Sequence, residues 1–100
     1  MKTIYPAKFV LEDTGEYSVL FPDLKGCVTY GENLEHALLM AQEALGLYLV
    51  ALEEYNHPKP KTSNFDTIET EKDEHIVPIA IDLNDYRRNK TVSKSITLPA

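Results

Sequence analysis

Few residues of this 100-residue chain have the types and spacing that catalysis requires. The histidines are His36, His57 and His75, and none lies at metal-ligand spacing from a cysteine or a carboxylate. Cys27 is the only cysteine, has no candidate base nearby in the sequence, and reads as a small buried hydrophobic residue. The sequence also lacks a phosphate-binding glycine loop and a serine nucleophile elbow. We therefore expect no catalytic site, no metal site and no cofactor.

Charge is distributed unevenly along the chain. Residues 1–86 contain all 16 acidic residues and 6 of the 10 Lys and Arg residues, a net charge of −10. Residues 87–100 contain four basic residues and no acid, a net charge of +4. An acidic body attracts basic partners and repels nucleic-acid phosphates, whereas a basic tail has the opposite preference. The alternative interpretation is that the acidic side chains form an ordinary solvated surface.

The sequence gives no indication of a membrane segment or of secretion. No apolar run reaches the roughly 18 residues of a membrane span. Residues 1–6 contain one lysine but no sustained apolar core, so we expect no secretory signal. A single cysteine cannot form an intrachain disulfide, which fits a reducing compartment, and we expect a cytoplasmic protein.

The first thirty residues alternate apolar and polar positions with the period of a β-strand. We predict strands over residues 5–12, 17–21 and 27–30. The turn at residues 13–16 contains a glycine suited to a positive φ, and residues 22–26 break the alternation before the third strand. Short turns between successive strands predict an antiparallel meander.

A long amphipathic helix is predicted next, capped by Asn33 or Glu32. Its sheet-facing stripe follows the helical period and consists of Leu34, Ala37, Leu38, Ala41, Ala44, Leu45, Tyr48, Leu49 and Leu52. Three further apolar residues point away from this stripe: Leu39, Leu47 and Val50. They are candidates for contact with a partner, although scattered exposed leucines are also common on small domains.

The chain beyond the helix contains one more predicted strand. Pro58 and Pro60 end the helix, and residues 61–75 indicate an acidic loop or a short helical turn. Residues 75–83 are predicted as a strand in which Pro78 favours an edge position. A polar bridge over residues 85–90 and a strand-like stretch over residues 93–100 complete the chain.

One motif is specific enough to indicate a family. The chain resembles the HicB antitoxin family in the turn Phe21-Pro22-Asp23-Leu24-Lys25-Gly26-Cys27 and in the helix start Asn33-Leu34-Glu35-His36-Ala37. It departs from the family pattern at Lys25, where proline is usual, and at His36, where an acid is common. Gly26 remains, so neither departure threatens the turn. The resemblance covers residues 3–86.

The resemblance implies an α+β fold and an antitoxin function. The expected domain, residues 1–86, is an antiparallel β-β-β-α-β partial ribonuclease-H-like sheet with one long helix packed on it. Residues 87–100 would be a basic linker and the possible start of a C-terminal DNA-binding element that is truncated or absent. The expected partner is a HicA-like basic toxin that cleaves RNA with a histidine, neutralised within a type II toxin–antitoxin system.

Three groups of residues are predicted to form contacts. The toxin-facing candidates are the acids near the loops, namely Asp23, Glu32, Glu35, Asp66, Glu69, Glu71, Asp73 and Glu74. The candidates for self-association into a dimer or tetramer are Leu39, Leu47, Val50, Ile79 and Ile81. The candidates for contact with operator DNA, through an incomplete C-terminal element, are Arg87, Arg88, Lys90 and Lys94.

Two other function classes stay open. A residual ribonuclease-H-like nuclease needs clustered carboxylates on adjacent strands to hold divalent metal ions. The interior of the first strand contains no acid and Asp82 stands alone on the last strand, which disfavours this reading. The second alternative is a stand-alone scaffold or regulatory module.

Overall fold

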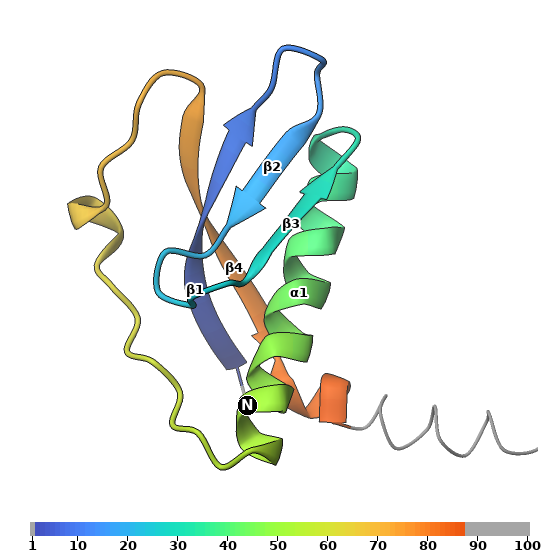
Figure 1. Ribbon diagram of the computed structural model, residues 1–100, viewed down its shortest axis with the longest axis vertical. Helices are drawn as coiled ribbons and strands as arrows, with labels where there is room; N and C mark the ends of the chain where they lie inside the picture. Colours follow the sequence, from blue (N-terminus) through green and yellow to red (C-terminus); the bar gives the residue numbers. More distant parts are fainter. Residues whose placement is uncertain (1, 88–100) are drawn as a thin grey trace, which may run out of the picture.

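The first three strands form the antiparallel meander that the sequence predicts. The computed structural model describes residues 2–87, and residues 1 and 88–100 lie outside the description. Its elements are β1 (Lys2–Leu11), β2 (Tyr17–Leu20), β3 (Val28–Gly31), α1 (Leu34–Glu54), the 3-10 helix η1 (Phe65–Thr67) and β4 (Glu74–Asp82) (Figure 1). The fold is therefore α+β, in the predicted order of elements.

The sheet has the strand order β3-β2-β1-β4 and is antiparallel throughout. β4 lies at one edge, as Pro78 predicts. Pro78 is opposite Pro6 of β1, and neither has a backbone N–H, which fits a pair whose backbone groups point away from each other. β2 pairs with β1 only from Lys8 onward. Both prolines thus occupy places where no neighbouring strand needs their N–H.

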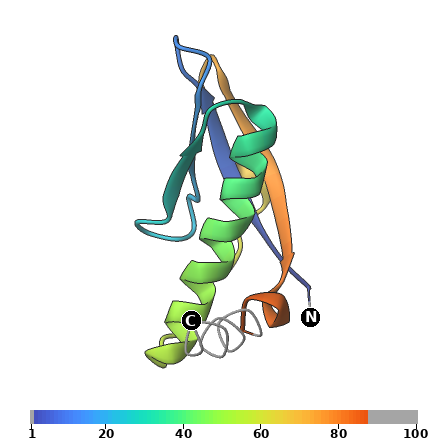
Figure 2. The same ribbon diagram turned by 90° about the vertical axis from the view of Figure 1, so that its right-hand side faces the viewer.

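The hydrophobic core lies between α1 and the face of the sheet on which the odd-numbered residues of β1 point. Tyr5, Ala7 and Phe9 are buried there together with Val19 of β2 and Ile79 of β4. α1 packs against β3, β2 and β4 (Figure 2). A Cβ at Gly31 would overlap the backbone of Ala37, so β3 and the first turns of α1 approach as closely as they do because residue 31 is glycine.

Asn33 caps α1 in the manner predicted for it. Its side-chain Oδ1 accepts a hydrogen bond of 2.9 Å from the backbone N–H of His36. The Nδ1 atom of His36 in turn accepts a hydrogen bond of 3.0 Å from the backbone N–H of Glu32. The histidine thus makes a bond similar to the reciprocal one of a capping box, but with the residue before the cap, so this position keeps an acceptor despite its departure from the family pattern.

The prediction for the helix face was partly wrong. Ala37, Ala41, Leu45 and Leu49 are fully buried against the sheet, whereas Leu34 and Leu38 of the same stripe are exposed. Val50, predicted to point outward, is buried. Leu34 and Leu38 are exposed although Ala37 and Ala41 of the same turns are fully buried. The burial of Val50 coincides with a segment that the sequence pattern did not place and that packs on α1 one turn earlier, at Gly46.

That segment is residues 83–87, which are helical instead of the predicted polar bridge. Leu83 is fully buried, and Tyr86 packs against the core and directly over Gly46 of α1, where a Cβ would overlap the tyrosine ring. The guanidinium of Arg87 forms an ion pair with Glu53 of α1. The turn thus packs on the flank of α1 at Gly46 and adds Leu83 to the hydrophobic core.

The family-specific turn between β2 and β3, residues 21–27, covers one end of the hydrophobic core. Phe21, Leu24 and Cys27 are buried, and backbone bonds link Leu24 to Phe21 and Cys27 to Leu24. Gly26 has the positive φ of 82° that the turn requires. The side chain of Tyr48 on α1 donates to the carbonyl of Lys25. The motif is therefore a packing device that joins the meander to the helix.

Candidate binding surfaces

Three acidic turns meet at one end of the sheet. The β1–β2 turn begins where β1 ends, Tyr17 pairs with Gly31 just before the β3–α1 turn, and Val10 pairs with Glu74 at the start of β4. The backbone N–H of Leu11 also donates to the carbonyl of Asp73. All three turns therefore lie together, at the top of Figure 1.

We call this region the acidic end. Its carboxylates are those of Glu12, Asp13, Glu16, Glu32, Glu35, Glu71, Asp73 and Glu74. They are eight of the 16 acidic residues of the chain, and only Lys8 and Lys72 oppose them on these turns and the adjoining strand ends. Like charges held close together produce a negative potential that extends beyond the surface and attracts basic groups.

One carboxylate of the acidic end also stabilises the turn before β4. Glu74 accepts a hydrogen bond of 3.0 Å from the backbone N–H of Glu71 and lies 3.4 Å from the Lys8 ammonium. The backbone hydrogen bond, with the lysine, lowers the pKa of Glu74. The stabilisation is present at neutral pH and is lost as the pH falls through the lowered pKa.

The sequence prediction and the acidic end overlap only in part. Among the predicted toxin-facing acids, those that lie in the acidic end are Glu32, Glu35, Glu71, Asp73 and Glu74. Asp66 lies in η1 and Glu69 follows it, on the long connection beside the sheet (Figure 1). The acids of the β1–β2 turn were missed, because only strand pairing shows that this turn lies next to the residues before β4.

Asp23 has a structural contact that the sequence does not reveal. Its carboxylate accepts hydrogen bonds of 2.7 Å from the backbone N–H and 2.5 Å from the hydroxyl of Ser63. Nearby, the Tyr5 hydroxyl donates to the carbonyl of Pro60 at 2.5 Å. These bonds fasten the long connection to the core, so Asp23 serves the fold in the free chain.

The residues predicted for self-association divide into two groups. Leu39 and Leu47 of α1 are strongly exposed. Val50, Ile79 and Ile81 are buried in the core, so their side chains do not reach the surface. The prediction counted apolar residues of β4 without knowing which face α1 covers, and α1 covers the face to which Ile79 and Ile81 point.

Four basic residues were predicted to contact DNA, and only Arg87 lies in the described part of the chain. Arg87 forms its ion pair with Glu53 and donates a hydrogen bond of 2.6 Å to the Asn84 side chain. Its guanidinium is therefore occupied within the fold instead of being presented to phosphate. Arg88, Lys90 and Lys94 lie outside the described residues.

Within residues 2–87 no group of three His, Cys, Asp or Glu side chains is placed to hold a metal ion. Glu74 and Asp82 lie at opposite ends of β4, roughly 26 Å apart at about 3.3 Å per residue. Cys27 is buried and its thiol contacts the carbonyl of Ala44 at 3.7 Å. Burial raises the pKa of the thiol to about 11, opposite to the shift that activates a nucleophile.

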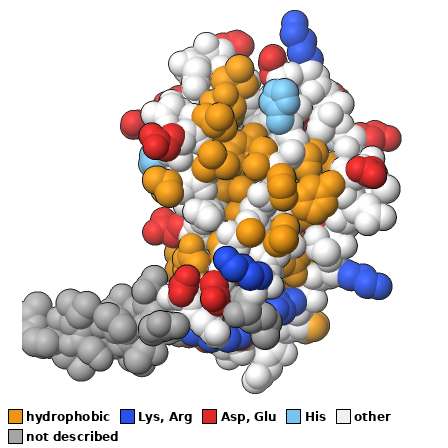
Figure 3. Space-filling view, turned by 180° about the vertical axis from the view of Figure 1, so that it is seen from behind, with side chains coloured by type: hydrophobic (Ala, Val, Ile, Leu, Met, Phe, Trp, Pro, Cys, Tyr) orange, Lys and Arg blue, Asp and Glu red, His pale blue; other side chains and the backbone are white. Residues whose placement is uncertain are grey.

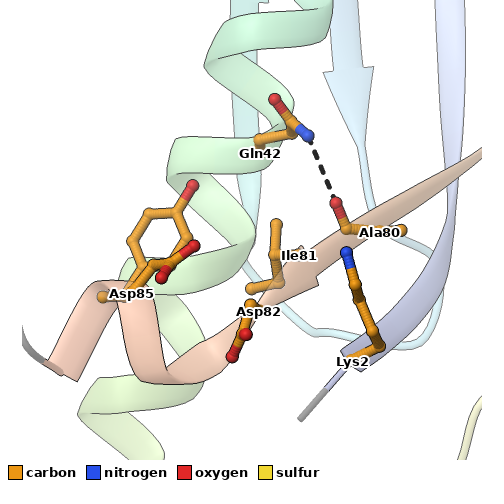
Figure 4. Close-up of a pocket in the computed structure, with 7 residues that line it drawn as sticks. Lys2, Gln42, Ala80, Ile81, Asp82 and Asp85 are labelled. Carbon is orange, nitrogen blue, oxygen red and sulfur yellow. Dashed lines mark hydrogen bonds between the residues drawn. The ribbon is translucent and has the colours of Figure 1, made fainter.

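A small open pocket of about 270 Å³ lies at the end of β4 remote from the acidic end (Figure 4). Its lining includes Lys2 of β1, Asp82 of β4, and Asp85 and Tyr86 of the helical turn after β4. At its rim the Gln42 amide donates to the carbonyl of Ala80 at 3.2 Å and covers part of the open edge of β4. No helix in the described part of the chain is long and apolar enough to cross a membrane.

Known proteins similar to this chain are antitoxins. A curated relative, Antitoxin HicB 2 of Photorhabdus laumondii subsp. laumondii, is 49% identical over 41 residues. That alignment spans 41% of this chain and 29% of the relative, so the chain matches less than a third of the relative's length.

Solved structures share the fold. A toxin–antitoxin complex from Streptococcus pneumoniae contains a chain with a TM-score of 0.76 and 27% identity, covering 86% of this chain and 73% of that one. The N-terminal domain of Burkholderia pseudomallei antitoxin HicB matches with a TM-score of 0.69 and 19% identity, covering 80% of this chain and 99% of that domain. A chain of the HicA3 and HicB3 toxin–antitoxin complex matches with a TM-score of 0.60 and 23% identity over 80% of this chain and 96% of that one.

A family model described as the HicB_like antitoxin of bacterial toxin–antitoxin systems matches residues 5–100. The match includes the buried turn between β2 and β3 and the capped start of α1, the two segments that carry the resemblance in the sequence. The chain belongs to the HicB_like antitoxin family.

Proposed function

We propose that this chain is an antitoxin that binds a small, basic, HicA-like RNA-cleaving toxin and covers its active site. Family membership supports the proposal, as do similar chains in complexes named for a toxin and an antitoxin. The observation that carries it is the acidic end, where three turns distant in sequence bring eight carboxylates to one end of the sheet. An RNA-binding enzyme must itself be basic, so such a surface complements it.

The proposed mechanism is steric and electrostatic. The negative potential of the acidic end steers the basic toxin into contact and increases the association rate. Once docked, the antitoxin occupies the surface that RNA would use, and its carboxylates replace RNA phosphates as partners of the toxin's Lys and Arg side chains. No bond is made or broken in this step, which agrees with the raised pKa of Cys27.

Self-association and DNA binding are secondary parts of the proposal. Leu39 and Leu47 are exposed on α1 and are available for contact with a second copy. Arg88, Lys90 and Lys94 belong to the proposed basic linker to a DNA-binding element that represses the operon. Because the proposed toxin acts on cellular RNA, we place the protein in the cytoplasm.

The test is an RNA-cleavage assay with the toxin encoded beside this chain. We expect cleavage to fall linearly as antitoxin is added and to stop near stoichiometric addition. A parallel reaction contains the antitoxin alone with Mg²⁺ or Mn²⁺ and tests for nuclease activity. Cleavage that continues at saturating antitoxin contradicts the proposal, and metal-dependent cleavage by the antitoxin alone supports the nuclease alternative.

A further inference from the structure

The leucines of the sheet-facing stripe are buried in the second half of α1 and exposed in its first two turns. Leu34 and Leu38 point in nearly the same direction as Leu45 and Leu49, because all four belong to one stripe of helical period. Leu45 and Leu49 are completely buried, but Leu34 is 49% exposed and Leu38 is 36% exposed. Beside the buried Ala37 and Ala41, the first two turns of α1 therefore present apolar side chains that nothing in the described part of the chain covers fully.

The sheet shows the same change toward the same end. Phe9 of β1 is 1% exposed, whereas Leu11, which points to the same face two residues later, is 38% exposed. On β4 the burial decreases from Ile79 to the half-buried Val77, in the direction of Glu74. In both α1 and the sheet, apolar side chains on the core side thus become more exposed toward the acidic end.

We call Leu11, Leu34, Leu38 and Val77 the open core end. Seen from behind, apolar side chains form a band along the molecule (Figure 3). Acidic side chains lie at its upper and lateral margins, and a basic side chain and a histidine also lie at the upper margin. Contiguous apolar surface on a small domain marks a site of contact more often than scattered exposed leucines do. The turns on either side of this surface are those of the acidic end.

The negative charge around the open core end indicates which kind of partner can bind there. A second copy docked here by two-fold symmetry would bring two acidic ends together, and like charges across an interface oppose association. A basic protein gains from the same arrangement, because its apolar side chains enter the open core end while its Lys and Arg side chains meet the carboxylates. The outer edge of β4 is a poorer site for strand addition, because Pro78 has no N–H and Gln42 covers the carbonyl of Ala80.

We propose that the open core end receives the apolar anchor residues of the basic toxin, so that the toxin completes the antitoxin core. This inference rests on the proposed function and specifies its surface. The two parts of the surface have different roles. The carboxylates govern the association rate and its dependence on salt, and the open core end governs how slowly the complex dissociates.

The test compares two double variants of the full chain. Leu34→Gln/Leu38→Gln removes apolar surface from the open core end, and Ile4→Gln/Leu20→Gln replaces equally exposed apolar side chains on the opposite face of the sheet. On α1, glutamine has nearly the helix propensity of leucine, and it adds no charge at any of the four positions. Affinity and rates are measured at several salt concentrations against a catalytically inactive form of the toxin encoded beside this chain.

We expect Leu34→Gln/Leu38→Gln to weaken binding about 30-fold at every salt concentration, mainly through faster dissociation. The control variant should bind within about threefold of wild type, a difference at the scale of ordinary surface substitutions. Circular dichroism and urea unfolding establish that each variant is folded. If the double variant unfolds, Leu34→Gln alone makes the comparison, because Leu34 is the more exposed of the two.

Three results would overturn the inference. Wild-type affinity in the folded Leu34→Gln/Leu38→Gln variant means that the toxin docks elsewhere, and the antitoxin function still stands. Dissociation of an antitoxin oligomer by this variant, with toxin binding unchanged, assigns the open core end to a second copy. If wild-type protein does not bind the toxin at low salt, the proposed function fails and the inference fails with it.

Discussion

At the scale of single residues, the positions that carry the family resemblance hold the fold together. Leu24 and Cys27 of the family-specific turn are buried, and Asp23 of that turn fastens the long connection through Ser63. Asp23 and Cys27, whose side chains could in principle take part in chemistry, therefore have structural contacts in this fold. The carboxylates that we propose for binding lie on turns at the opposite end of β2 and β3, outside the motif.

Cys27 should be chemically inert in the folded protein. Burial raises the pKa of its thiol to about 11, so only a very small fraction is thiolate near neutral pH. We expect Ellman's reagent at about pH 8 to react more than about 100-fold more slowly with native protein than with protein in denaturant. Comparable rates in the two states would show that the β2–β3 turn is open in solution.

At the scale of elements, the contact of residues 83–87 with α1 was the hardest to foresee. Hydrophobic periodicity places Val50 on the outer side of α1, and that placement is correct for the helix alone. In the structure Val50 belongs to the hydrophobic core, one turn after Gly46, over which Tyr86 packs. Nothing in the sequence indicates the contact with Tyr86 except a glycine at position 46. Gly46 in the interior of a helix is the one signal that could have indicated a close approach.

The same reasoning explains what the sequence did predict. Strand alternation, the Asn33 cap and Pro78 as an edge residue depend on local chemistry, and each was confirmed. The acidic end depends on which turns lie side by side, which follows from strand pairing and not from local pattern. The prediction therefore found five of its eight carboxylates and missed Glu12, Asp13 and Glu16.

Gly46→Ala tests the contact between α1 and residues 83–87. In an isolated helix this change stabilises by about 1 kcal/mol, but here the added methyl would overlap the Tyr86 ring. We expect a loss of about 1–3 kcal/mol in the free energy of unfolding, measured by urea denaturation.

Tyr86→Ala provides the background that isolates this contact. In that background Gly46→Ala should become neutral or stabilising, since the overlapping ring is gone and only helix propensity remains. An equal loss in both backgrounds would mean that Tyr86 does not lie over Gly46.

At the scale of the whole molecule, the chain is electrically polarised along its sheet. Carboxylates from three turns outnumber lysines at one end, and the apolar core is open at that same end. A domain of this size buries a modest share of its surface, so a partner that covers the open core end adds to its stability. Bound toxin should therefore raise the unfolding temperature of the antitoxin, as any ligand specific for the folded state does.

The measurement that tests the central claim most directly is the salt dependence of toxin binding by two charge variants. One variant, Asp13→Asn/Glu32→Gln/Glu71→Gln, removes one carboxylate from each turn of the acidic end. The other, Glu43→Gln/Asp66→Asn/Glu69→Gln, removes three carboxylates elsewhere and changes the net charge equally. We expect the first to weaken binding at least about tenfold at low salt, with an effect that shrinks as salt is added, and the second to change it much less. Equal effects of the two variants would show that net charge alone attracts the toxin, and a larger effect of the second would place the toxin on the other side of the molecule.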